Sequence, residues 1–117
     1  MPALYALPRN HLRACLALLV AEGPAHGYEL LDRLAALGLA GADCGAVYKT
    51  LRSMEADDHV ASAWAPSSSG PARRTYRITG PGRAWLGRSA AAVAVQRDAV
   101  GAYLDRHLHL VAGRRCA

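Results

Sequence analysis

Apolar residues recur three and four positions apart along the first part of the chain, and this spacing predicts amphipathic helices. A first helix is expected over residues 9–21, ending before Gly23 and Pro24, because both residues break helices. A second helix is expected from about Gly27 to Gly38, where glycine favours a C-terminal stop. The chain is therefore predicted to begin with two helices joined by a short break.

A third helix is expected from about Cys44 to Asp57. It follows Asp43, whose short carboxylate suits the N-cap position. One face of this helix carries an apolar stripe, and polar side chains lie away from it. The stripe consists of Val47, Leu51 and Met54, and the residues on the other sides are Tyr48, Lys49 and Arg52.

From His59 the pattern changes to the alternation that is typical of β-strands. Strands are expected over residues 59–65 and 72–79, joined by a tip rich in serine, glycine and proline. In the second strand two sets of side chains would point to opposite faces. These sets are Thr75, Arg77 and Thr79 on one face, and Arg74, Tyr76 and Ile78 on the other.

A long final helix is expected from Pro81 to about residue 111, with apolar residues Leu86, Val93 and Val100 repeating every seven positions. Such a helix is about 45 Å long at the standard rise. A domain of this size offers nothing large enough to cover it, so the stripe is expected to pair with a second copy of the chain. A twofold dimer would place two equivalent third helices about one turn of DNA apart.

The order helix, helix, helix, hairpin, long helix predicts a mostly α fold with a small β-hairpin, an α+β winged helix-turn-helix. Residues 1–79 are expected to form the DNA-binding domain, and residues 80–117 a C-terminal dimerisation helix with a basic tail. In this arrangement the third helix enters the major groove of DNA. The hairpin, or wing, contacts the flanking backbone.

Charge is distributed unevenly along the 117 residues. Residues 1–58 hold five basic and seven acidic side chains, whereas residues 59–117 hold nine basic and two acidic ones. The net charge is +5 and the isoelectric point is about 9.6. A basic half of this kind points to a polyanion, with nucleic acid favoured over an anionic membrane.

The third helix supplies the first candidate DNA contacts. Lys49 and Arg52 lie three positions apart, so they can reach adjacent phosphates or a guanine edge. Thr50 and Ser53 are minor candidates on the same helix. Tyr48 is a further candidate, and the alternative is that it packs at the start of the helix.

The wing supplies the second group of candidates. Arg73 and Arg74 follow its tip, and guanidinium groups suit phosphate oxygens. They are expected to position the protein on DNA rather than to select its sequence. Arg77 is a third candidate, with a solvated strand residue as the alternative.

Three motifs in order resemble the PadR family of bacterial transcriptional regulators, over roughly residues 12–86. They are Glu22-Gly23-Pro24-Ala25-His26-Gly27-Tyr28-Glu29-Leu30, Gly45-Ala46-Val47-Tyr48-Lys49-Thr50-Leu51-Arg52-Ser53-Met54-Glu55 and Gly70-Pro71-Ala72-Arg73-Arg74-Thr75-Tyr76-Arg77-Ile78-Thr79. The resemblance implies a dimeric repressor that binds operator DNA. It also implies release of the DNA when a small molecule, often aromatic, binds.

One stretch departs from the family pattern. Where the family usually has an acidic residue, then glycine and an aliphatic residue, this chain has Asp57-Asp58-His59-Val60. Without that glycine, Asp58 is expected to adopt the left-handed conformation that ends the helix, or the helix must end differently.

The aromatic residues are candidates for an effector site. Trp85 at the start of the last helix could line an apolar cavity with its symmetry mate, and Gln96 and Tyr103 would add polar groups. Trp64 is a weaker candidate, and the alternative for both tryptophans is a packing role. An alternative function on this scaffold is binding or sequestration of an aromatic drug or natural product, as in resistance.

Other chemistry is not indicated. The cysteines Cys15, Cys44 and Cys116 lack CxxC spacing, and His107 and His109 point apart on a helix, so neither a metal site nor a cofactor is expected. Cys44 near His59 suggests a redox switch, as a third hypothesis. No catalytic group stands out, so an enzyme is not expected.

Without a signal peptide or an apolar span, a cytoplasmic protein without membrane contacts is expected.

Overall fold

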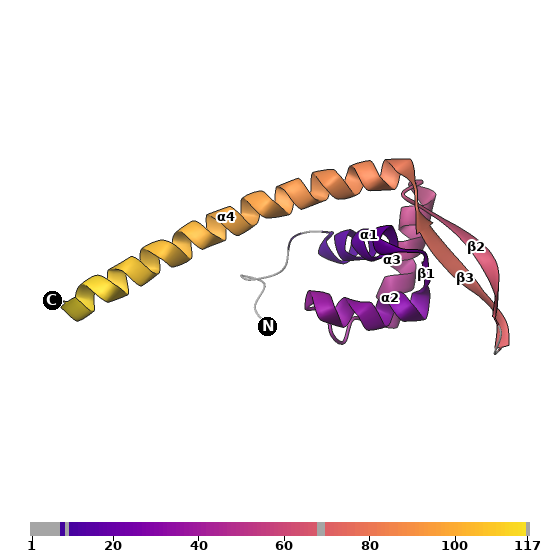
Figure 1. The fold of residues 1–117 in the computed structure, drawn as a ribbon, viewed down its shortest axis with the longest axis horizontal. Coiled ribbons are helices and arrows are strands. Elements are labelled where there is room, and N and C mark those ends of the chain that lie inside the picture. The colour runs from indigo at the N-terminus through magenta and orange to yellow at the C-terminus, as the bar shows by residue number, and fades with distance from the viewer. Residues whose placement is uncertain (1–7, 9, 68–69, 117) are drawn as a thin grey trace. The chain divides into compact units, whose positions relative to one another are not determined.

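The computed structural model describes residue 8, residues 10–67 and residues 70–116. Its elements follow the predicted order of three helices, a hairpin and a long helix (Figure 1). They are α1 (His11–Glu22), β1 (Ala25–His26), α2 (Gly27–Arg33), the 3-10 helix η2 (Leu34–Leu37), α3 (Cys44–Ala56), β2 (Val60–Ser67), β3 (Gly70–Ile78) and α4 (Gly80–Cys116). The mostly α fold class with a small antiparallel sheet is confirmed.

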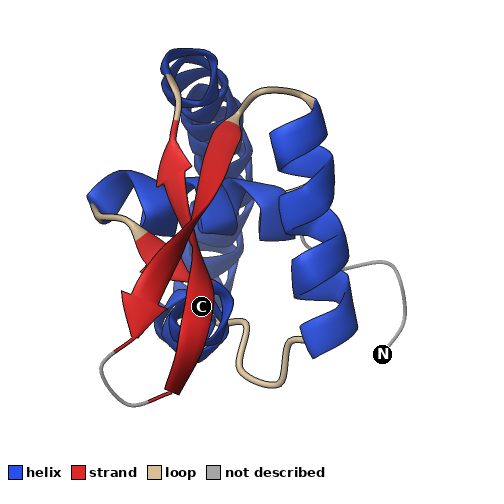
Figure 2. Ribbon diagram, turned by 90° about the vertical axis from the view of Figure 1, so that its right-hand side faces the viewer, coloured by secondary structure: helices blue, strands red, loops and turns tan. Residues whose placement is uncertain are grey.

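The sheet has three strands in the order β1-β3-β2, all antiparallel. Strands β2 and β3 form the twisted hairpin of Figure 2, paired from Val60 with Ile78 to Ala65 with Arg73. The prediction of a hairpin alone was incomplete, because β1 adds a short third strand beside β3. The segment before α2 had been expected only as a break between helices.

Helices α1, α2 and α3 pack around one core with the sheet. The α3 stripe is confirmed as the inner face, since each of its three residues is fully buried. Tyr76 is the buried residue of β3, as its alternation with exposed arginines predicts. The core consists of Cys15, Leu16, Ala17, Leu19, Val20, Ala25, Leu30, Leu34, Val47, Leu51, Met54, Val60 and Tyr76.

The helix ends follow local sequence chemistry. Asp43 caps α3, where its carboxylate accepts a hydrogen bond from the Ala46 amide at 3.0 Å. Asp58 has φ 61°, so it takes the left-handed position expected of it after α3. The second helix ends earlier than predicted, at Arg33, and η2 continues the chain to Gly38, which has φ 82°.

The start of α4 is fitted closely against the corner between α3 and β2. Thr79 Oγ1 accepts a hydrogen bond from the Gly82 amide at 3.0 Å and donates one to the Asp58 carbonyl. Gly82 is buried, and a Cβ built on it would lie 2.0 Å from the His59 carbonyl oxygen. Only glycine therefore fits at this position without a backbone shift.

The chain divides into two compact units, Met1–Gly87 and Arg88–Ala117. Helix α4 runs through both, and its first turns belong to the first unit because Trp85 and Leu86 pack against the core. In the second unit the described apolar side chains are largely exposed. They include Val95, Val100, Tyr103, Leu104, Leu108, Leu110 and Val111. The domain boundary expected after Thr79 stays a prediction.

No helix in the described parts of the chain is long and apolar enough to cross a membrane.

Candidate nucleic-acid interface

Helix α3 presents Lys49 and Arg52 to solvent, while its opposite face is buried in the core. The burial of Val47, Leu51 and Met54 fixes the rotation of the helix about its axis. The two exposed basic side chains are therefore held on the outer face by packing on the inner one. This is the arrangement that contact with a DNA groove requires.

The other candidates on α3 have partners inside the protein. Thr50 Oγ1 donates a hydrogen bond to the Ala46 carbonyl of its own helix at 2.7 Å. Ser53 Oγ accepts one from Arg13 at 3.2 Å. Both hydroxyls are thus engaged in stabilising the fold, and their contact with DNA stays a prediction.

Tyr48 lies at the junction of α3 and α2. It packs against the core, and a Cβ on Gly27 would lie 2.4 Å from the Tyr48 hydroxyl oxygen, so the glycine makes room for the phenol. Desolvation by burial raises the pKa of Tyr48. These contacts favour the packing alternative for the ring, although Tyr48 also lines a surface cavity.

A chain of polar contacts joins the wing to α3. Arg74 Nε donates to Ser62 Oγ at 2.8 Å, and the Ser62 hydroxyl donates to a Glu55 carboxylate oxygen at 2.7 Å. The Arg74 guanidinium lies 3.7 Å from the other Glu55 oxygen and 5.7 Å from the centre of the Trp64 ring. Arg74 is therefore held in place on β3 rather than free in solvent.

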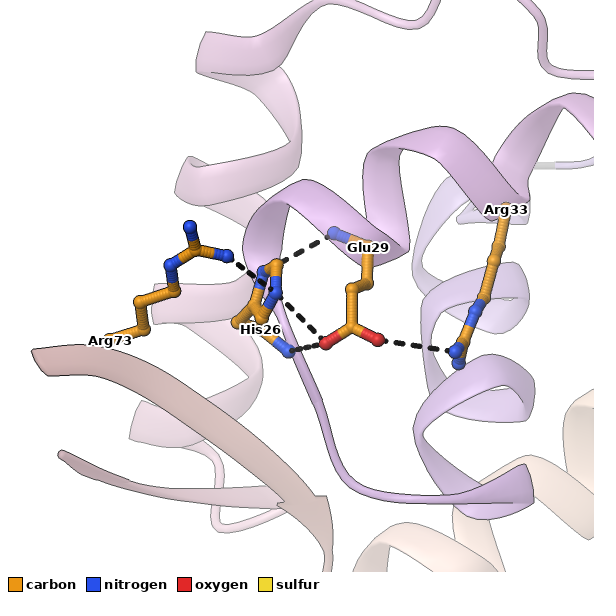
Figure 3. A network of polar contacts seen from close by, with 4 residues as sticks. All are labelled: His26, Glu29, Arg33 and Arg73. Atoms are coloured by element: carbon orange, nitrogen blue, oxygen red, sulfur yellow. Dashed lines mark hydrogen bonds and ion pairs between the residues drawn. The ribbon is translucent and has the colours of Figure 1, made fainter. Parts of the chain in front are cut away.

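A second network joins the wing to the start of α2, as Figure 3 shows. Arg73 lies 3.1 Å from His26 Nε2, and the same nitrogen lies 3.0 Å from a Glu29 oxygen. His26 and Glu29 also form a capping box, and the second Glu29 oxygen accepts from Arg33 at 3.2 Å. A neutral imidazole cannot accept from Arg73 and donate to Glu29 through one nitrogen, so these contacts compete.

Arg77 is exposed on β3, whereas the neighbouring Tyr76 is buried. Burial raises the pKa of the Tyr76 phenol, and the nearby Arg74 guanidinium opposes that rise. The observed faces thus agree with the predicted alternation.

Arg13 is a structural residue that helical periodicity did not identify. Its guanidinium donates to Asp57 at 2.7 Å, lies 3.0 Å from His59 Nδ1 and sits 5.4 Å from the centre of the Trp85 ring. The His59 and Trp85 rings are 5.5 Å apart. Arg13 thereby joins α1 to the end of α3 and the start of α4.

A cavity of about 320 Å³ opens between the wing and the helices. Its walls come from the start of α2, from α3 and from both long strands. Aromatic rings and guanidinium groups dominate this wall. The lining residues are His26, Gly27, Tyr28, Tyr48, Trp64, Arg73, Arg74 and Tyr76. An adjoining cavity on the α3 side adds Arg52 and Glu55.

The candidate effector residues lie on different parts of the chain and do not form one cluster in the first unit. Trp64 lines the wing cavity and is 67% exposed, whereas Trp85 stacks beside His59 and under Arg13. Gln96 and Tyr103 are exposed on the second unit. Within the first unit the two tryptophans therefore do not share one site.

The cysteine and histidine candidates make only local or structural contacts in the described residues, such as Cys15 Sγ with His11 Nε2 at 3.6 Å and His107 with the Tyr103 ring at 6.5 Å. Cys44 opens α3 and His59 lies beyond its other end, so the expected proximity of the two was wrong. Cys15 is buried, and burial raises the pKa of its thiol. Among the residues that the structure describes, no cluster of histidine, cysteine or carboxylate side chains could hold a metal ion.

Solved structures confirm the winged-helix fold. A PadR-like regulator from Bacillus cereus has a TM-score of 0.72 at 26% identity, covering 80% of this chain and 90% of its own. A PadR-like transcription factor from Bacteroides fragilis has a TM-score of 0.65 at 29% identity, covering 77% and 86%. A PadR family regulator from Eggerthella lenta has a TM-score of 0.64 at 32% identity, covering 80% and 84%.

No curated protein sequence matches the chain significantly. The sequence profile of the transcriptional regulator PadR-like family matches residues 15–88, which is more than half of the chain. This range takes in most of α1, all of α2, the sheet, α3 with its exposed basic face, and the first turns of α4. The chain belongs to the PadR-like family of transcriptional regulators.

Proposed function

We propose that this chain is a dimeric repressor that binds operator DNA through α3 and the wing. One observation carries the proposal: Lys49 and Arg52 are exposed on α3, and polar contacts tie the adjacent wing to that helix. The base-contacting and the backbone-contacting groups thus belong to one compact unit. Lys49 and Arg52 would contact the major groove, and Arg73, Arg74 and Arg77 the flanking phosphates.

The test is DNA binding to the region upstream of the chain's own gene, measured by fluorescence anisotropy at several salt concentrations. Changing Arg52 to Ala should lower affinity for the operator more than for a scrambled duplex. The double change of Arg73 and Arg74 to Ala should weaken binding to both and flatten the salt slope by about one to two. Arg97→Ala is the matched control, because this side chain is 77% exposed on the second unit.

Dimerisation is part of the proposal, and the exposed apolar residues of α4 support it. Val100 is 59% exposed and Leu104 is 52% exposed, in a helix that carries several more such side chains. Exposed apolar stripes of this length are typical of surfaces that bind another chain. Light scattering of the purified protein should give twice the chain mass, and a monomeric mass would contradict this part of the proposal.

The dimer helix is also the proposed place for an aromatic effector, with Trp85, Gln96 and Tyr103 as candidates. The alternative function, sequestration of such a compound, predicts a different pair of results. Quenching of tryptophan fluorescence by planar aromatic compounds without any DNA binding would favour sequestration. Quenching together with release of bound DNA would favour an effector-controlled repressor.

A further inference from the structure

Two exposed aromatic side chains that line the cavity between the wing and the helices have no role in the proposed function. Tyr28 at the start of α2 is 65% exposed, and Trp64 on β2 is 67% exposed. Large aromatic side chains are costly to leave in water, and a solvent-facing pair within one cavity is typical of a binding surface. Arg73 and Arg74 border the same cavity.

The position of the cavity indicates what would fill it. In the proposed complex α3 lies in the major groove and the wing lies beside it, so the sugar–phosphate backbone between the grooves passes between them. The cavity opens at this place, with Tyr48 of α3 on one side and the wing residues on the other. We propose that it receives one stretch of sugar–phosphate backbone, with Tyr28 and Trp64 packed against deoxyribose and the two arginines at the phosphates. This inference rests on the proposed function.

Arg74 is prepared for such a contact. Its Nε donates to Ser62, and the 3.7 Å approach to Glu55 involves one terminal nitrogen. A guanidinium has five N–H donors, so several remain for a phosphate. The stacked position over Trp64 leaves the side chain 48% exposed, which gives a phosphate access to it.

Arg73 can exchange its partner without leaving a polar group unsatisfied. In the free protein it lies 3.1 Å from His26 Nε2, a nitrogen that also lies 3.0 Å from Glu29. When Arg73 moves to a phosphate, His26 donates from Nε2 to Glu29 and its Nδ1 accepts from the Glu29 amide. The exchange replaces a contact with an imidazole ring by a charge-assisted hydrogen bond to an anionic phosphate.

Sugar contacts and phosphate contacts predict different salt behaviour. An arginine that neutralises a phosphate releases a counterion, so its loss lowers the salt slope by about one. An aromatic ring packed on deoxyribose releases none. Trp64→Ala should therefore weaken binding to operator and scrambled duplex alike, by about tenfold, with an unchanged slope.

The experiment uses the full chain and both duplexes, with Trp64→Ala, Tyr28→Ala and Leu18→Ala compared by anisotropy. Leu18 is an exposed apolar residue of α1 outside the cavity, so its variant should bind as wild type does. If both aromatic variants bind as wild type while Arg52→Ala is impaired, the cavity does not hold the backbone and the proposed function stands. If wild type binds neither duplex, both proposals are overturned. A Trp64→Ala loss confined to the operator would also overturn the inference.

A second measurement leaves the aromatic side chains of the cavity in place. The chain has two tryptophans, so Trp85→Phe leaves Trp64 as the only indole reporter. Its fluorescence should change on addition of DNA, with the same midpoint as the anisotropy. If the emission spectrum of Trp85→Phe stays constant while DNA binds, Trp64 does not contact the DNA and the inference is overturned.

Discussion

The two units of the chain differ in whether their apolar side chains are buried or exposed. Among its described residues, the first unit, Met1–Gly87, buries thirteen in one core and leaves only a few large apolar side chains exposed. In the second unit, Arg88–Ala117, Val95 and Tyr103 are each 69% exposed. The first unit completes its own core, whereas an isolated helix cannot do so. The second unit therefore leaves an apolar surface uncovered, which the proposed dimer would bury.

The largest effect is expected from charges placed on the second unit. Val100→Asp combined with Leu104→Asp should prevent pairing of α4 with a second copy, because the interface would bury two carboxylates. Operator affinity should fall by a factor of about 10³, because a monomer contacts only one of the two half-sites that a dimer contacts together. Light scattering should show a monomer.

The same variant checks the independence of the first unit. Its core lies outside the changed residues, so the near-ultraviolet dichroism of Trp85 and Tyr76 should be retained. Global unfolding of the variant would contradict the view that the first unit completes its own core. Arg97→Ala, a nearby exposed change, is the control and should leave the mass unchanged.

A change inside the first unit should act on stability instead. Gly82→Ala places a Cβ 2.0 Å from the His59 carbonyl oxygen and 2.8 Å from the carbonyl carbon. Backbone atoms cannot move aside as a side chain can, so the free energy of unfolding should fall by about 3 kcal/mol. Thermal or urea unfolding measures the loss.

Gly87→Ala, in the same helix, is the matched control for that change. A Cβ at Gly87 meets nothing within 4 Å, so this variant should unfold at the wild-type temperature or slightly above it. Equal stabilities of the two variants would show that the start of α4 does not pack against the α3–β2 corner as described.

Much of the first unit could be predicted because its signals are local. Helical spacing identified α1 and α3, the aspartate before Cys44 identified a cap, and alternation identified the hairpin. Strand β1 could not be predicted, because two residues have no periodicity and pair only with the distant β3. The sequence pattern also does not display the change from α2 to the 3-10 helix at Leu34.

The candidate site divides similarly. Lys49 and Arg52 follow from their place opposite a buried stripe, which a sequence pattern displays. The partners of the wing arginines could not be predicted from such a pattern, because Arg73 contacts a residue 47 positions away. Arg13 contacts Asp57 across 44 positions. Contacts of this range depend on the folded arrangement of several elements.

Arg13 is a largely buried charged residue of the first unit, and removing it should have a moderate effect. Its side chain is 15% exposed and contacts Ser53, Asp57 and His59. Arg13→Ala should lower the free energy of unfolding by about 2 kcal/mol, because those partners lose a charged donor. Arg33→Ala, at a 48% exposed side chain, should cost under about 1 kcal/mol in the same urea titration. Equal losses would mean that the Arg13 cluster contributes no more than a surface ion pair.

The smallest expected effect is a loss of stability at high pH, caused by two tyrosines of the first unit. Burial raises the pKa of Tyr48 and Tyr76 above the ordinary tyrosine value of 10.0. The folded state then retains protons that the unfolded state releases, so the two phenols contribute stability that is constant below about pH 10 and is lost as pH rises further. The buried Cys15 thiol, whose pKa is also raised by burial, adds a decline that begins at lower pH and is present in every variant. Urea unfolding between about pH 8 and 11 should show this decline. The double variant Tyr48→Phe and Tyr76→Phe should show a shallower one. An equally steep decline in that variant would show that other groups titrate. It would contradict the burial of these two phenols in the first unit.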